Sequence, residues 1–99
     1  MEKIKVLITK QLSPSETEYI RTSLGDEFNL ISPEEFSEEG ILKHIEDVKI
    51  LLGDNITKSM IEKSEAQLIQ VPWAGVENLD FELLSNYDIS VCNSHSNAL

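Results

Sequence analysis

The chain has 99 residues, 40% of them hydrophobic, a size and composition typical of one folded α/β domain rather than of two domains or a disordered chain. Its 18 acidic and 8 basic residues give a formal net charge of −10. Because nucleic acids and anionic membranes both attract clustered Lys and Arg, this charge argues against either partner. A small anionic ligand is compatible with it, since backbone N–H groups can bind an anion locally.

Five short apolar runs recur along the chain and are predicted to be β-strands. They span residues 4–9, 28–32, 48–53, 67–71 and 89–93. Three of them are apolar at consecutive positions, which is typical of strands buried on both faces, as in a parallel sheet.

The first two helices are predicted from matching Ser-Pro starts. Ser13 has the residue type of an N-cap, Pro14 follows at the first helical position and Glu16 lies three residues after the cap, while Gly25 is expected to stop the helix. A second Ser-Pro-Glu-Glu sequence predicts another helix start at Ser32.

Two further helices are predicted in the second half of the chain. A short one is expected to begin near Thr57. Another is expected to begin near Asn78, where Leu79, Leu83 and Leu84 share one face.

The resulting βαβαβαβαβ order predicts an α/β fold, a flavodoxin-like open parallel sheet of about five strands in the order 2-1-3-4-5 with helices on both faces. Ligands of such sheets bind beyond the carboxyl ends of the strands, near the point where the strand order reverses. The loops of interest are therefore residues 9–13, 53–56 and 72–76.

Cofactor and metal motifs are absent from the sequence. It contains neither G-x-G-x-x-G nor the phosphate-binding G-x-x-x-x-G-K, so no cofactor site is expected in these residues. Cys92 and His95, with His44 elsewhere, make a poor metal site, and no metal is expected. As the only cysteine, Cys92 excludes an internal disulfide; together with an N-terminus that lacks a signal or membrane segment, it predicts a cytoplasmic protein.

Asp54 follows the third strand, where receiver domains carry their phosphoacceptor. The other three receiver signatures are missing, so Asp54 is expected to be a solvated loop residue or a helix cap.

The turn "PWAGVEN" after the fourth strand suits a bound carboxylate. Gly75 and Ala74 expose their N–H groups, and the helix expected from Asn78 would direct its positive end toward them. Short β–α turns commonly contain Gly, however, so an ordinary turn with Trp73 packed at the edge of the core is an open alternative.

Residues 68–98, LIQVPWAGVENLDFELLSNYDISVCNSHSNA, resemble the N-terminal catalytic-domain segment of the D-isomer-specific 2-hydroxyacid dehydrogenases. That family carries a strand, G-x-G-V-D-N-I-D, a helix, G-I-x-V-x-N and a linker helix rich in Asn and Ala. Here AGVENLD, YDISVCN and SNAL correspond to these motifs. The resemblance covers essentially the whole chain and is most specific over residues 68–98.

The resemblance implies a substrate-binding lobe over residues 1–93 and the start of a truncated interdomain linker helix over 94–99. It implies a parent enzyme that transfers hydride between NAD or NADP and a 2-hydroxy or 2-oxo acid. The nucleotide-binding domain and the catalytic Arg, Glu and His would lie outside these residues, so the lobe alone would be inactive. The parent would be a homodimer that binds neither nucleic acid nor membrane.

By the same resemblance, the N–H groups of Ala74 and Gly75 would hold the substrate carboxylate. Trp73 and Val76 would line the pocket beside them, and Asn55 would contact the substrate from the loop after the third strand. Many phosphoglycerate-type members carry a basic residue where this chain has Gly-Asp at 53–54, so a phosphate in the substrate is not expected.

A second reading stays open: a free-standing flavodoxin-like binding or signalling module, receiver-like, with Asp54 as its key residue. Sequence does not identify the particular acid, the choice of NAD or NADP, or the oligomeric state of the lobe.

Overall fold

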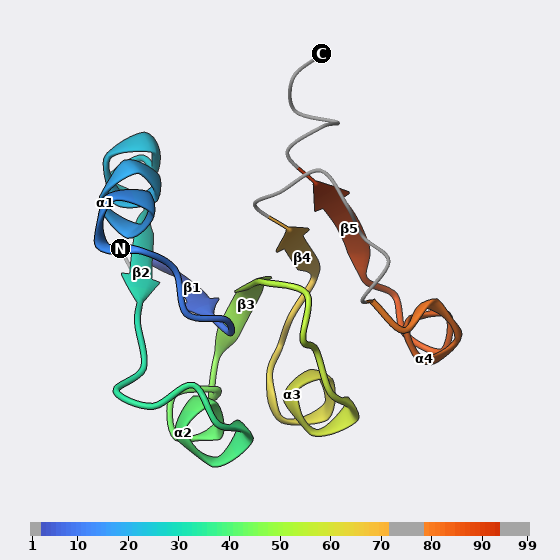
Figure 1. Ribbon diagram of the computed structural model, residues 1–99. Helices are drawn as coiled ribbons and strands as arrows, with labels where there is room; N and C mark the ends of the chain where they lie inside the picture. The colour runs from blue at the N-terminus through green and yellow to red at the C-terminus, as the bar shows by residue number, and fades with distance from the viewer. Residues whose placement is uncertain (1–2, 72–78, 94–99) are drawn as a thin grey trace.

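The computed structural model describes residues 3–71 and 79–93. Its five strands form one parallel sheet in the order β2-β1-β3-β4-β5 (Figure 1), which confirms the predicted fold class and strand order. The strands are β1 (Ile4–Ile8), β2 (Phe28–Ile31), β3 (Val48–Leu52), β4 (Leu68–Val71) and β5 (Ser90–Asn93).

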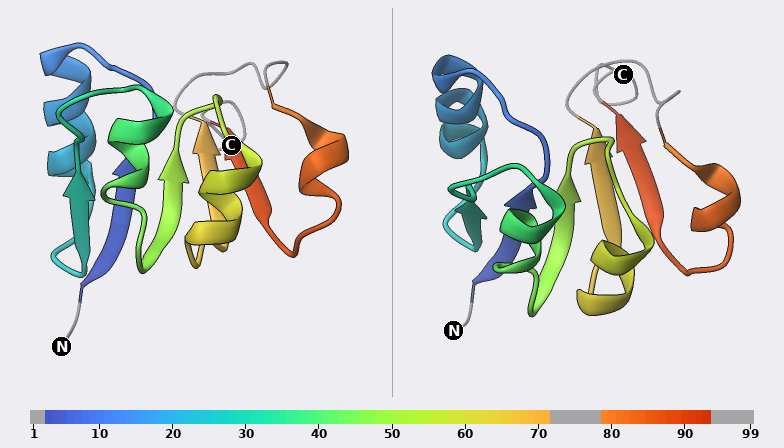
Figure 2. Two further views of the ribbon diagram at one scale, coloured as in Figure 1. Left: turned by 90° about the horizontal axis from the view of Figure 1, so that it is seen from below. Right: turned by 60° about the horizontal axis from the view of Figure 1, so that its bottom comes forward.

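Alternate residues of the strands build two separate cores, because successive side chains point to opposite faces of a sheet. On one face, Leu7, Leu51 and Ile69 are fully buried beneath apolar residues of three helices. On the other face, Val6, Ile8 and Leu52 are buried with the apolar side of a single helix. Figure 2 shows this arrangement, with helices on both faces as predicted.

The single helix on its face is α1 (Pro14–Ser23), and its start is built as the sequence predicts. The Ser13 hydroxyl accepts a hydrogen bond from the Glu16 N–H, and the Glu16 carboxylate accepts one from the Ser13 N–H. This reciprocal capping satisfies two backbone donors that the first turn leaves without partners.

The opposite face carries α2 (Glu38–Leu42), α3 (Lys58–Lys63) and α4 (Phe81–Leu84). The predicted start of α3 is confirmed, since the Thr57 hydroxyl accepts a hydrogen bond from the Met60 N–H. Met60 and Ile61 on α3 and Ile41 on α2 then fill the core under the sheet.

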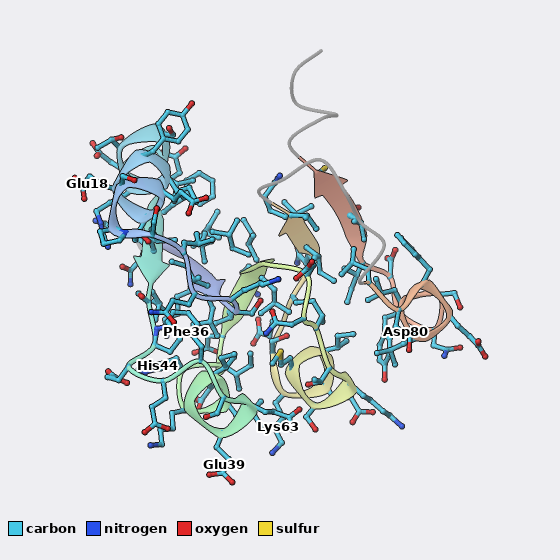
Figure 3. All side chains as sticks on the ribbon, in the orientation of Figure 1. Glu18, Phe36, Glu39, His44, Lys63 and Asp80 are labelled. Carbon is cyan, nitrogen blue, oxygen red and sulfur yellow. The ribbon has the colours of Figure 1, made fainter. Side chains whose placement is uncertain are left out.

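The prediction of a helix start at Ser32 is wrong. The cap of α2 is Ser37, whose hydroxyl accepts from the Gly40 N–H, and residues 32–36 are not helical. Pro33 is buried, and Phe36 packs against the core of the α1 face (Figure 3). This tertiary packing needs a non-helical path, so the helix begins later in the chain, after Ser37.

The fourth helix also begins later than predicted. Its cap is Asp80 (Figure 3), whose carboxylate accepts a hydrogen bond from the Leu83 N–H, and the helix begins at Phe81 rather than near Asn78. Leu79 and Leu84 are buried as expected from their spacing, while Leu83 is partly buried.

Candidate functional site at the switch in strand order

The loops after β1 and β3 leave the sheet in opposite directions. The chain passes from β1 to β2 on one side, and from β3 through β4 to β5 on the other, so strand order reverses between β1 and β3. Open α/β sheets bind ligands at this point, beyond the carboxyl ends of the strands. Here that edge is occupied by polar side chains at positions 9, 10, 54 and 55.

Thr9 and Asn55 join the two loops by a reciprocal pair of hydrogen bonds. The Thr9 hydroxyl donates to Asn55 Oδ1 at 2.9 Å, and Asn55 Nδ2 donates to the Thr9 carbonyl oxygen at 2.7 Å. Thr9 is fully buried, and its hydroxyl also lies 3.3 Å from the Leu52 carbonyl oxygen. Asn55, expected from the family resemblance to contact substrate, therefore has both polar atoms of its side chain bonded to Thr9.

Gly53 makes this junction possible. Its φ of 149° lies where L-residues are strained, and a Cβ added there would overlap the Thr9 hydroxyl. The Gly53 N–H donates to the Gln70 carbonyl oxygen at 2.9 Å, which ties the same loop to β4.

Asp54 is not the solvated residue or helix cap that the sequence suggests. It is 2% exposed, and Lys10 Nζ from the loop after β1 lies 3.5 Å from its Oδ1. A buried carboxylate needs a cation and hydrogen-bond donors to offset the loss of water, and Lys10 supplies the charge. A phosphoacceptor must meet a phosphate donor, so this burial argues against the receiver-like role.

The turn expected to bind a carboxylate, with Trp73, Ala74, Gly75 and Val76, lies outside the described residues. The structure does describe β4, which ends at Val71 and pairs with β3. The helix that was expected to direct its positive end toward the turn does not begin near Asn78 as predicted. The helix α4 begins at Phe81 and its first turn receives the carboxylate of Asp80.

The other candidate residues, at positions 44, 92 and 95, are only partly described by the structure. His44 Nε2 lies 3.0 Å from Glu34 Oε2, and this contact lowers the pKa of the Glu34 carboxyl. Cys92 is partly exposed on β5, and His95 lies outside the described residues. Over residues 3–71 and 79–93, no group of three metal-ligating side chains occurs, and no helix is long and apolar enough to cross a membrane.

Sequence reasoning missed Lys10 and Thr9 as parts of this edge. The strand order points to the loop after β1 as one of three candidate ligand-binding loops, but no known binding motif marks a particular residue in it. Their partners lie in another loop far along the chain, 46 positions away for Thr9 and Asn55, so local pattern offers no signal for the pairing.

A parallel sheet in this order, with helices on both faces, defines an α/β domain. The family model for the D-isomer specific 2-hydroxyacid dehydrogenase catalytic domain matches residues 6–98, and the chain belongs to that family. No curated protein sequence matches significantly.

Two solved structures share the fold. The NAD+-bound 3-phosphoglycerate dehydrogenase of Entamoeba histolytica superposes with a TM-score of 0.70 at 24% identity, over 92% of this chain. The holo D-mandelate dehydrogenase of Rhodotorula graminis superposes with a TM-score of 0.62 at 14% identity, over 95% of this chain. The chain spans 32% of the length of each.

Proposed function

We propose that these residues form the substrate-binding lobe of an NAD-dependent D-2-hydroxyacid dehydrogenase, which transfers hydride between nicotinamide and C2 of a 2-hydroxy or 2-oxo acid. The observation that carries the proposal is the family match over residues 6–98. The polar junction at the switch in strand order supports it, because this is the edge where such sheets bind ligands.

Within this lobe, the N–H groups of Ala74 and Gly75 bind the substrate carboxylate, and Trp73 and Val76 line the pocket beside them. Hydrogen bonds to an ionised group contribute about 1.5–3 kcal/mol each, so a pair of N–H donors with water excluded is enough to orient a small acid. Asn55 reaches the substrate with the remaining capacity of its amide, which can donate two hydrogen bonds and accept two. Its two bonds to Thr9 hold it in place.

The nucleotide and the catalytic Arg, Glu and His belong to a separate domain in this proposal. The sequence contains no G-x-G-x-x-G, so these residues do not fit NAD or NADP. The lobe by itself neither binds NADH nor turns over substrate. The parent enzyme is a cytoplasmic homodimer joined through its nucleotide domains, without nucleic-acid or membrane partners.

The proposal is tested by substituting Gly75 in the full-length enzyme and measuring reduction of a panel of 2-oxo acids with NADH. The Gly75→Val variant places a side chain where the carboxylate would bind. We expect the KM for the acid to rise at least about tenfold, equivalent to about 1.4 kcal/mol, while the KM for NADH changes little.

Gly25→Val is the matched control. Gly25 precedes β2, and the three atoms nearest to an added Cβ there all belong to the flexible end of the Glu27 side chain. Its kinetic constants should stay close to those of the parent. A Gly75→Val enzyme with unchanged KM and only a lower melting temperature would show that the turn is structural, and the binding role would be rejected.

A further inference from the structure

Thr9 holds the side chain of Asn55 in one rotational state. The Thr9 carbonyl oxygen can only accept a hydrogen bond, so the amide atom that lies 2.7 Å from it is Nδ2. Oδ1 then faces the Thr9 hydroxyl and accepts its proton at 2.9 Å. An amide turned by half a rotation would set two acceptors against each other, Oδ1 and the carbonyl oxygen. A single residue therefore fixes which way round the Asn55 amide sits.

Thr9 is itself fixed against the end of β3. Its N–H donates to the Leu52 carbonyl oxygen at 2.9 Å, and its hydroxyl lies 3.3 Å from the same oxygen. Its side chain is fully buried, and Gly53 leaves room for the hydroxyl where a Cβ would overlap it. A residue held in this way can restrain an exposed side chain, which lowers the entropy cost of binding through that side chain.

Asn55 is exposed in the loop after β3, beside the switch in strand order where open α/β sheets bind ligands. Its amide can donate two hydrogen bonds and accept two, and the bonds to Thr9 use one of each. Because both of those bonds lie on the same edge of the planar amide, the second N–H and the second lone pair point to opposite flanks. A ligand therefore meets a donor on one flank or an acceptor on the other.

The side chain of a 2-oxo acid is the part that Asn55 is left to recognise. In the proposed function, main-chain N–H groups bind the carboxylate, and the catalytic residues of the second domain act on the 2-oxo group. A hydroxyl on C3 both donates and accepts, so it can pair with either flank of the amide. A second carboxylate can only accept, and the net charge of −10 repels it.

We propose that Thr9 is a positioning residue that orients the Asn55 amide, and that the oriented amide selects 2-oxo acids with a hydroxyl on C3. This inference rests on the proposed function above. Orientation matters because an amide that turns freely must be ordered when the ligand binds, and this ordering offsets part of the hydrogen bond that is gained.

The test compares hydroxypyruvate with 2-oxobutanoate in the full-length enzyme, because the two acids differ only by a hydroxyl in place of a methyl group. The KM of the parent enzyme should be lower for hydroxypyruvate by about fivefold, the ratio that corresponds to one hydrogen bond. Asn55→Ala should reduce this ratio to less than about twofold, with kcat little changed, because only binding is affected.

Thr9→Val keeps the shape of the side chain but removes the donor to Oδ1. It should lower the ratio of the two KM values to about half of the parent's ratio or less. Thr9→Ser, which keeps the hydroxyl, should retain most of the ratio. In the Asn55→Ala background, Thr9→Val should have no further effect on the ratio, as expected of a residue that acts through Asn55.

Thr22→Val is the matched control, since it makes the same substitution at a hydroxyl that bonds the Tyr19 carbonyl oxygen on the exposed surface of α1. It should leave the ratio unchanged. If Thr9→Val changes both KM values equally, or if Thr9→Ser behaves as Thr9→Val does, Thr9 has only a structural role and the inference is overturned. A parent enzyme with equal KM values for the two acids, or a lower one for 2-oxobutanoate, overturns it as well.

Calorimetric dissociation constants for both acids, measured with the parent and Thr9→Val proteins, separate this failure from failure of the proposed function. If no 2-oxo acid is reduced, the proposed function is wrong. The role of Thr9 then stands only if the parent binds hydroxypyruvate more tightly than 2-oxobutanoate and Thr9→Val diminishes the difference. Any other pair of dissociation constants rejects it.

Discussion

Thr9 joins two loops with one short side chain. A hydroxyl has one proton to donate. The nearer acceptor of the Thr9 hydroxyl is Asn55 Oδ1 at 2.9 Å, and the Leu52 carbonyl oxygen lies farther away at 3.3 Å. Thr9 is fully buried, whereas Asn55 is exposed, so water can reach the Asn55 amide if the hydroxyl is lost. Without the hydroxyl the junction would keep only the bond from Asn55 Nδ2 to the Thr9 carbonyl oxygen.

We expect Thr9→Val, which keeps the shape of the side chain, to lower the free energy of unfolding by about 0.5–1.5 kcal/mol, the usual net contribution of one hydrogen bond. Urea denaturation measures it. Thr22→Val is the control, because the Thr22 hydroxyl bonds the Tyr19 carbonyl oxygen on the exposed surface of α1. Similar losses in the two variants would show that the junction contributes nothing specific.

The helices show how the same local signal can be used in one place and ignored in another. Ser13 and Ser32 both precede Pro and Glu, yet only Ser13 caps a helix. After β2, the cap is Ser37, and Gly40 permits the first turn of α2 to lie against the Glu35 backbone, where a Cβ would overlap it.

Substitutions at the two serines should separate the used cap from the unused one. Ser37→Ala removes the acceptor of the Gly40 N–H and should cost about 1 kcal/mol of stability. Ser32→Ala should change stability by less than about 0.5 kcal/mol, as is usual for an exposed residue outside such features. Thermal or urea unfolding compares them, and an equal loss at Ser32 would contradict the observed start of α2.

For the molecule as a whole, two electrostatic effects oppose each other as pH falls. The pKa values of three carboxyls are lowered: Glu16 by the N–H of Ser13, Glu34 by His44, and Glu65 by Lys49. Lowered pKa values mean stability that is present above the ordinary value of 4.5 and is lost as pH falls below it. Repulsion among the acidic residues acts the other way, since it weakens toward the pI of about 4.4.

Salt should distinguish these effects. At pH 7, raising the ionic strength from 0.01 to 0.15 M shortens the Debye length from about 30 to about 8 Å and should raise the melting temperature, because repulsion at a net charge of −10 is screened. Near pH 4.4 the same change should have little effect. In 0.15 M salt, stability should fall below pH 4.5. A salt effect of equal size at both pH values would contradict this account.

The sequence by itself determined the strands, their order and two of the helix starts. Apolar runs and the Ser13 and Thr57 caps are local signals, and parallel βαβ connections leave few possible topologies. The family match likewise follows from sequence and was anticipated from residues 68–98.

Only the tertiary structure decided where α2 begins and that the Asp54 side chain is buried and paired with Lys10. The Asp54 carboxylate is buried because β3 ends beneath the loop after β1, where Lys10 can reach it. The side chain of Asn55 is bonded to Thr9 for the same reason. These contacts join residues far apart in the chain, so their energies depend on the folded arrangement and leave no periodicity or spacing in the sequence.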